Sequence, residues 1–126
     1  MATLVNAGLE RKARLVCGDS SSSFQWTALG SGSTAESNSD TALATEITTN
    51  GGARMIGDTV AYEADYKAKW VSTWTFSGAL AINECGVFDQ LAVGGTMLFR
   101  HVFAATKNVV SGDTLQITFY ETESRA

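Results

Sequence analysis

Two runs of β-forming residues flank a glycine-containing turn between Leu80 and Phe103. Residues 80–88 and 97–103 are rich in apolar and aromatic side chains, and residues 89–95 between them end in two consecutive glycines, which is a signal for a turn. Because side chains alternate between the two faces of a strand, the second run places apolar groups on both faces. We therefore predict a β-hairpin in the middle of a sheet, with at least one face in a hydrophobic core.

The clearest alternating pattern lies between Tyr66 and Phe76. Trp70, Trp74 and Phe76 share one face of this segment, and Lys, Val and Thr residues occupy the other. The pattern predicts a half-buried antiparallel strand, and burial of one large aromatic side chain contributes about 2–3 kcal/mol of transfer free energy. The predicted core consists of Trp70, Trp74 and Phe76 from this strand, Val87 and Phe88 from the hairpin, and Leu115 and Ile117 from a final strand.

Helical spacing is confined to the first half of the chain. Residues 3–17 carry apolar side chains along one stripe, with the charged residues outside it, so they predict an N-terminal helix. A second, short helix is predicted from Asp40 or Thr41, either of which is a suitable N-cap, to Ile47. The polar segments 18–23 and 30–39 are expected to be loops, the second of which lacks the lysine of a phosphate-binding motif.

The length and composition suit a single domain. The 126 residues allow one core, and a hydrophobic content of 44% is enough to fill it. Further strands are predicted at residues 24–28 and 53–62, with the main sheet region spanning about 53–121. Strands separated by Gly, Asn and Ser turns favour a mainly β, antiparallel β-sandwich over residues 1–126. A layered α+β arrangement is the alternative.

The charge excludes some partners. The formal net charge is −4 and the isoelectric point is near 4.8, whereas nucleic-acid binding favours a basic surface. No run reaches the about 20 apolar residues that span a membrane, and the charged N-terminal segment does not resemble a signal peptide. We therefore expect synthesis in a cytoplasm and binding to neither nucleic acid nor membrane. Cys17 and Cys85 lack metal-ligand spacing and are interpreted as reduced, buried thiols, with a disulfide as the alternative.

No catalytic or metal site is expected. His101 is the single histidine, it lies within a predicted strand, and no nucleophile-elbow motif accompanies it, so we assign it a structural or interface role. Glu63 and Asp65 lie in a turn-like segment, where exposed carboxylates are expected rather than an acid–base pair or a calcium site. The chain is thus predicted to be neither an enzyme nor a cofactor-binding protein.

Glu84 is an acidic residue in an otherwise apolar predicted strand. A buried carboxylate needs a partner, and Arg54 or Arg100 has the guanidinium geometry to supply one. The alternative is that Glu84 faces solvent at the edge of a sheet.

Short motifs distributed over most of the chain suggest a family. They are Leu4–Leu9, Ala28–Gly32, Thr41–Leu43, Glu46–Ile47, Arg54, Asn83–Asp89, Gly94–Leu98 and Ser111–Leu115. In this order and spacing they resemble the N-terminal domain family of tail-collar fibres of tailed bacteriophages. Collar fibres continue into a shaft, whereas this sequence stops at Ala126, so the expected protein is an adaptor or a small decoration protein.

The resemblance implies a virion structural protein. We expect a capsid decoration (cement) protein that stabilises the shell by contacting the major capsid protein, with a tail, baseplate or tail-fibre attachment subunit as the alternative. A carbohydrate-binding sandwich is the third hypothesis, since Trp26, Trp70 and Trp74 could form a stacking platform. The resemblance also implies that Arg54 and Glu84, which both match family positions, form a buried ion pair. A homotrimer is expected, with Leu98, Arg100 and Val102 as its interface face.

Overall fold

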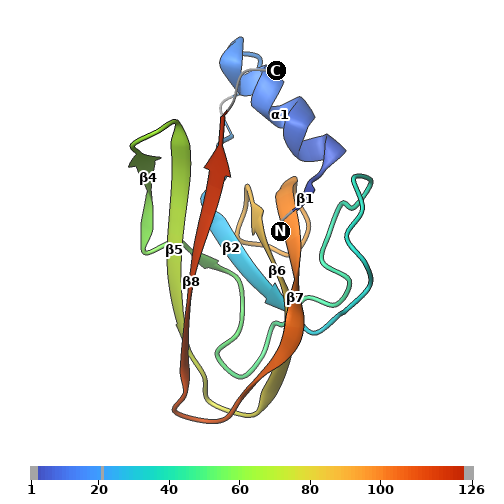
Figure 1. Cartoon of the computed structure of the whole chain (residues 1–126), viewed down its shortest axis with the longest axis vertical. Helices are drawn as coiled ribbons and strands as arrows, with labels where there is room; N and C mark the ends of the chain where they lie inside the picture. The colour runs from blue at the N-terminus through green and yellow to red at the C-terminus, as the bar shows by residue number, and fades with distance from the viewer. Residues whose placement is uncertain (1–2, 21, 124–126) are drawn as a thin grey trace.

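The computed structural model describes residues 3–20 and 22–123, which form two antiparallel sheets and one helix (Figure 1). The elements are β1 (Thr3–Leu4), α1 (Asn6–Val16), β2 (Trp26–Gly30), β3 (Met55–Ile56), β4 (Thr59–Glu63), β5 (Lys67–Thr75), β6 (Leu80–Phe88), β7 (Met97–Val109) and β8 (Thr114–Thr122). The prediction of a mainly β, antiparallel chain with an N-terminal helix is therefore confirmed.

The two sheets differ in size. The larger has the strand order β1-β7-β6-β2-β3, and the smaller has the order β4-β5-β8. The predicted hairpin is β6 and β7, which lies in the middle of the larger sheet. β7 is longer than predicted, and the turn after it leads directly to β8 of the other sheet (Figure 1).

A single aromatic-rich core lies between the two sheets. Trp70, Trp74 and Phe119 of the smaller sheet pack in one cluster with residues of β2, β6 and β7. The indole N–H groups of Trp70 and Trp74 donate to the backbone oxygens of Phe24 and Ala53, at 2.7 and 3.0 Å, so both polar atoms are satisfied inside the core. The predicted core residues Trp70, Trp74, Phe76, Val87 and Phe88 are buried, whereas Leu115 and Ile117 are only half-buried and pack against the core.

Helix α1 covers one end of the sheets (Figure 1). It begins at Asn6 rather than at residue 3, because Thr3 and Leu4 form β1 and pair with β7. Gly8 lies directly on the start of β7, and a Cβ atom there would be 2.5 Å from the backbone oxygen of Leu98. The absence of a side chain thus lets the helix backbone touch the strand.

The second predicted helix, from residue 40 or 41 to residue 47, does not form. The backbone N–H groups of Ala44 and Thr45 donate to the Glu84 carboxylate, and that of Ile47 donates to the Leu29 oxygen of β2. These donors are therefore not available for helical bonds to oxygens four residues earlier. The segment instead runs beside β2 as an extended loop, with one isolated bridge between Gly30 and Glu46.

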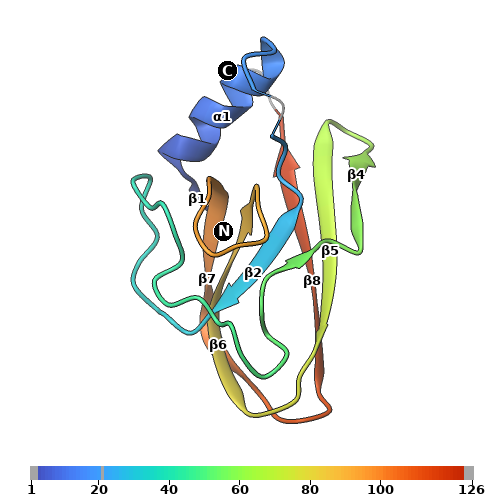
Figure 2. The same ribbon diagram turned by 180° about the vertical axis from the view of Figure 1, so that it is seen from behind.

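The predicted strand at 53–62 is divided in the structure. Its two parts, β3 and β4, belong to different sheets and are separated by Gly57 and Asp58. The connection between β2 and β3 covers the larger sheet on the side seen in Figure 2. Leu43 from this connection packs with Ala28, Phe88 and Met97 in a second, smaller cluster.

Candidate assembly surface

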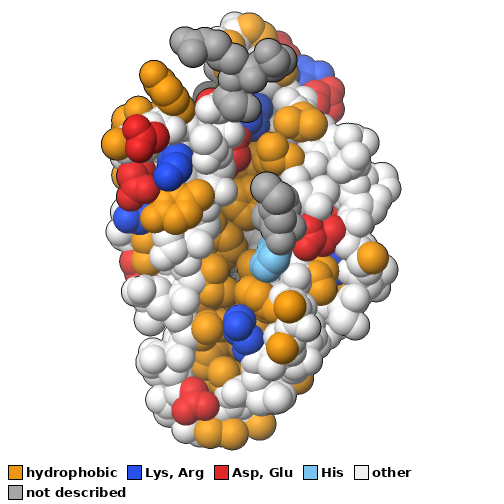
Figure 3. All heavy atoms as spheres, in the orientation of Figure 1, with side chains coloured by type: hydrophobic (Ala, Val, Ile, Leu, Met, Phe, Trp, Pro, Cys, Tyr) orange, Lys and Arg blue, Asp and Glu red, His pale blue; other side chains and the backbone are white. Residues whose placement is uncertain are grey.

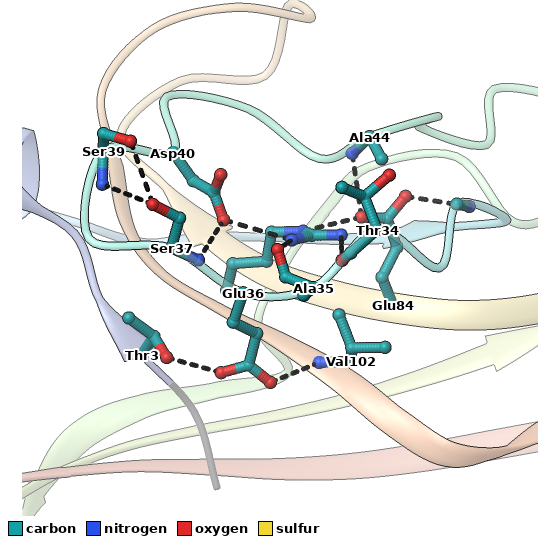
Figure 4. Close-up of polar contacts among 12 residues, drawn as sticks. Thr3, Thr34, Ala35, Glu36, Ser37, Ser39, Asp40, Ala44, Glu84 and Val102 are labelled. Carbon is teal, nitrogen blue, oxygen red and sulfur yellow. Dashed lines mark hydrogen bonds and ion pairs between the residues drawn. The ribbon is translucent and has the colours of Figure 1, made fainter.

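The Glu84 carboxylate organises the loops over the larger sheet. It is completely buried, and its Oε2 accepts hydrogen bonds from the backbone N–H groups of Gly32 and Thr45 at 3.0 and 2.8 Å. Its Oε1 accepts from the Ala44 N–H at 2.8 Å and from Arg100 Nε at 2.9 Å. One side chain of β6 thereby fixes two parts of the β2–β3 connection, which lies far from it in the sequence (Figure 4).

The glycine-rich segment at Gly30 therefore surrounds a carboxylate of the protein itself. A Cβ atom on Gly30 would lie 2.4 Å from Glu84 Oε2. The glycine allows this close approach of backbone to carboxylate, as a phosphate-binding loop would allow approach to a phosphate. The segment was expected to be a plain surface loop, and its role in holding Glu84 was not predicted.

Arg100 is the ionic partner of Glu84. Its guanidinium is about 1% exposed and also donates to Asp40 Oδ2 at 3.1 Å and to the Thr34 and Ala35 oxygens at 2.7 and 3.3 Å. Burial alone would lower the pKa of Arg100, but the hydrogen bonds and charges of Glu84 and Asp40 outweigh it and raise the pKa above its ordinary value. The pair is thus charged and fully hydrogen-bonded, which a buried ion pair requires to be tolerated.

The predicted ion pair between Arg54 and Glu84 is wrong. Both side chains are buried, as expected, but Arg54 pairs with Glu46 through Nε and Nη2, at 3.0 and 2.6 Å. The second sequence-based alternative, Arg100, is the partner of Glu84. The alternative of a solvent-facing Glu84 is also wrong.

Arg54 holds the loop between β6 and β7. Its Nη1 donates to three backbone oxygens of this loop, those of Gln90, Ala92 and Gly94, at 2.9–3.0 Å. Its guanidinium carbon lies 3.8 Å from the centre of the Phe88 ring, a cation–π contact. Glu46 balances the positive charge of the buried Arg54 guanidinium. The three hydrogen bonds from this one arginine fix the course of the loop.

A second arginine fixes the base of the same loop. Arg11 of α1 donates to Asp89 Oδ2 at 2.7 Å and to Thr96 Oγ1 at 3.1 Å, and Asp89 in turn accepts from the Thr96 N–H at 2.8 Å. The loop nevertheless exposes 58% of Leu91 and 63% of Val93 at its tip. We call residues 89–96 the presented loop. It combines a fixed backbone with two exposed apolar side chains, which is typical of a contact surface.

The predicted trimer face is closed within one chain. Leu98 and Arg100 are buried, and Val102 is half-buried. The Val102 N–H donates to Glu36 Oε2 at 2.8 Å, and Glu36 Oε1 accepts from Thr3 Oγ1 at 2.6 Å. These residues are therefore occupied by contacts inside the protomer, and a trimer would need another surface.

An apolar groove of about 300 Å³ lies between β7 and β8. Figure 3 shows hydrophobic side chains gathered along the middle of this face. Phe99 and Phe103 form the wall on β7, and Ile117 and Phe119 form the wall on β8. The groove opens the core to solvent at the place where the two sheets are not hydrogen-bonded to each other.

A second hollow, of about 330 Å³, lies between α1 and β5. Its apolar lining includes Phe24, Tyr62 and Trp70, and its charged groups are Lys12, Lys69, Glu121 and Glu123. Lys12 forms ion pairs with both glutamates. Since Lys69 pairs with Glu63, each of these charged groups already has an ionic partner, and the hollow offers a ligand little beyond apolar contact.

Cys85, His101 and Glu36 have the residue types of a cysteine–histidine–acid triad. Cys85 and His101 are paired across β6 and β7, and His101 Nδ1 lies 3.5 Å from Glu36 Oε2. Burial, followed by the nearby glutamates, raises the pKa of the Cys85 thiol to about 12, so the nucleophilic thiolate is disfavoured. The arrangement argues against cysteine catalysis.

The remaining residues considered in the sequence analysis are the two cysteines and the acidic residues Glu63 and Asp65. Cys17 is exposed and Cys85 is buried, and both are free thiols, so the prediction of two buried thiols is wrong for Cys17. Glu63 pairs with Lys69 at 3.1 Å, and Asp65 is exposed. Within residues 3–20 and 22–123, no group of three or more acidic, histidine or cysteine side chains is arranged to hold a metal ion.

Sequence analysis did not predict the ion pairs of Glu46, Asp40 and Glu36, three carboxylates of the β2–β3 connection. Glu46 pairs with Arg54 of the same connection, whereas Asp40 and Glu36 lie against Arg100 and His101 of β7. Only a general signal of these pairs is present in the sequence. Acidic residues occur in the polar region 30–47, and two arginines, Arg54 and Arg100, occur in apolar surroundings elsewhere in the chain. That signal does not say which residues meet.

The sequence matches no known protein-family model, and comparison with curated proteins gave no match. Among the described residues, no helix has the length and apolar character that crossing a membrane requires.

Proposed function

We propose that this chain is a non-enzymatic structural subunit of a bacteriophage particle, and that it decorates the capsid by contacting the major capsid protein. The supporting argument begins with the motifs that resemble collar-fibre domains. Glu84, Arg54 and Glu46 belong to those motifs. Each forms a buried ion pair, Glu84 with Arg100 and Arg54 with Glu46. The motifs thus serve the scaffold, as expected where a family shares a structural role rather than a reaction.

The observation that carries the proposal is the presented loop. Arg54 and Arg11 fix its backbone, so little conformational entropy is lost when a partner binds. Leu91 and Val93 supply apolar area at its tip. A rigid loop that exposes two apolar side chains suits a permanent protein–protein contact better than the binding of a small molecule.

The arrangement of the two sheets around one core supports classification as a β-sandwich, which is a common architecture for such subunits. The expected location is the virion, after synthesis in the host cytoplasm. A tail, baseplate or tail-fibre attachment subunit is the second candidate, because the presented loop serves either place equally. A carbohydrate-binding role is less favoured, since Trp70 and Trp74 are buried and cannot stack on a sugar.

The test compares particles with and without the protein. Particles assembled without this gene product are incubated with the purified chain and sedimented. We expect wild-type protein to cosediment and the double variant Leu91→Asp/Val93→Asp not to. Val110→Asp is the matched control, because Val110 is equally exposed but lies in the turn after β7. Immunogold labelling then gives the location: label on the shell supports decoration, label on the tail supports the second candidate, and no binding to particles contradicts both.

A further inference from the structure

β8 has an unusually open edge. Sheets in soluble proteins protect their edges with short strands, charged side chains or covering loops. The outer strands β1 and β3 have two residues each and β4 has five, whereas β8 has nine. Within residues 3–20 and 22–123, β8 pairs only with β5, and no side chain bonds to its free backbone edge.

The neighbouring edge of β7 is protected in contrast. Glu36 accepts the Val102 N–H, and Lys107 adds a charge further along the strand. Residues 114–120 of β8 contain no charge, no proline and no glycine. The acidic residue near the end of the strand, Glu121, forms an ion pair with Lys12. The open edge is therefore both unpaired and uncharged, and it borders the apolar groove.

We propose that the β8 edge binds the β8 edge of a second copy of this chain, in antiparallel orientation about a two-fold axis at Thr118. This register overlaps all nine residues and joins the two small sheets into one continuous sheet. In this register each residue lies opposite one whose number has the same parity, so the core-facing side chains of the two β8 strands lie on the same face of the joined sheet. The opposed pairs are Thr114 with Thr122, Leu115 with Glu121, Gln116 with Tyr120, and Ile117 with Phe119.

Several features favour a second copy as the occupant. No pair in this register places like charges opposite each other, and the Ile117–Phe119 pair combines a β-branched with an aromatic side chain, which stabilises antiparallel strands. Ile117 and Phe119 also line the groove, so the added strand brings their counterparts beside Phe103 and covers it. Such an isologous contact closes on itself as a dimer. The inference concerns association between copies and does not rest on the virion role.

Cross-linking tests the register. In a Cys17→Ser background, Thr118→Cys should form an intermolecular disulfide under mild oxidation, because directly opposed Cα atoms lie within disulfide range. Thr114→Cys should not, since its two copies would be about 27 Å apart. Both positions are exposed, so the folded protomer tolerates the change. Equal cross-linking at both positions, or none at Thr118, overturns the register.

Sedimentation tests the contact itself. The wild-type chain should sediment as a dimer, and Thr118→Lys should be monomeric because it places like charges opposite each other. Thr59→Lys is the matched control: it is exposed on β4, the opposite edge of the same sheet, and should remain dimeric. A wild-type monomer, a trimer, or a dimer that both lysine variants leave intact would overturn the proposal. Loss of binding to another protein in Thr118→Lys, with a monomeric wild type, would assign the edge to that protein instead.

Discussion

Arg100 Nε on β7 donates a 2.9 Å hydrogen bond to Glu84 Oε1 on β6, with both side chains buried. The same carboxylate accepts hydrogen bonds from three backbone N–H groups in two parts of the β2–β3 connection. Because every lone pair position on Glu84 faces a donor, the pair is part of a network that defines the shape of the loops. It is this network, and not an isolated ion pair, that a substitution disturbs.

Glu84→Gln should destabilise the protein by about 3 kcal/mol or more. A glutamine amide group presents two N–H donors, and either orientation sets them against existing donors: Gly32 and Thr45 on one side, Ala44 and Arg100 on the other. Urea unfolding measures the loss. Glu63→Gln is the control, because the surface pair with Lys69 is expected to contribute less than about 1 kcal/mol. Equal losses in the two variants would contradict the account.

Replacing both charges should not rescue the protein. For an isolated buried ion pair, replacing both charges by apolar residues is far milder than removing one of them. Here Glu84→Leu/Arg100→Met leaves three backbone N–H groups and two backbone oxygens without partners. Each unpaired buried group costs about 1–3 kcal/mol. We expect the double variant to be at least as unstable as Glu84→Gln, and a clearly more stable double variant would refute the network.

Arg54→Lys should loosen the presented loop. A lysine ammonium lacks the planar fork that reaches both Glu46 oxygens and three loop oxygens at once. Backbone order parameters of residues 90–94 are expected to fall from about 0.85 to below about 0.6. Arg14→Lys, at an exposed ion pair, should leave the loop unchanged. Retained order in Arg54→Lys would show that the loop is fixed by other contacts.

Glu36, which joins the β2–β3 connection to Thr3 of β1 and Val102 of β7, should make the stability of the protein depend on pH in the acidic range. Burial acts to raise the pKa of Glu36, but the bonds from Thr3 and Val102 and the charge of His101 outweigh it and hold the pKa below 4.5. A carboxyl group whose pKa is depressed by folding stabilises the protein at higher pH, and this contribution is lost as pH falls through the folded value. The stability difference between wild type and Glu36→Gln, about 1.5–3 kcal/mol at pH 6, should shrink as the pH falls below the ordinary pKa of a glutamate and through the lower folded value. An unchanged difference would contradict this.

The two thiols should differ sharply in reactivity. Cys17 is exposed, whereas Cys85 is buried and its pKa is about 12, so very little thiolate forms at neutral pH. A thiol reagent should modify one cysteine quickly in the folded protein and the second only after unfolding. Cys17→Ser should abolish the fast reaction. A fast reaction that survives in this variant would place Cys85 at an accessible site.

The strands could be predicted from the sequence where one face of a strand is buried. Trp70 and Trp74 alternate with polar residues, and that period reports burial of one face directly. The loop from residue 40 to residue 47 could not be predicted, because its backbone donors bond to Glu84, which lies about forty residues away. Local capping signals favour a helix there, and a distant carboxylate overrides them.

The ion pairs show the same limit. Arg54 and Glu84 were recognised as buried charges, but each has a different partner from the one predicted. Composition and pattern identify which charges are buried, whereas the pairing depends on how the β2–β3 connection crosses the sheet. The open edge of β8 could not be predicted either, because the sequence pattern does not show which strand lies at the edge of a sheet.

The copy number of the chain in purified phage particles tests the central claim most directly. Quantitative mass spectrometry gives its amount relative to the major capsid protein of the same particles. The account predicts an amount of the same order as the capsid protein, as a shell-covering subunit requires. Absence of the chain from purified particles would contradict the proposed structural role.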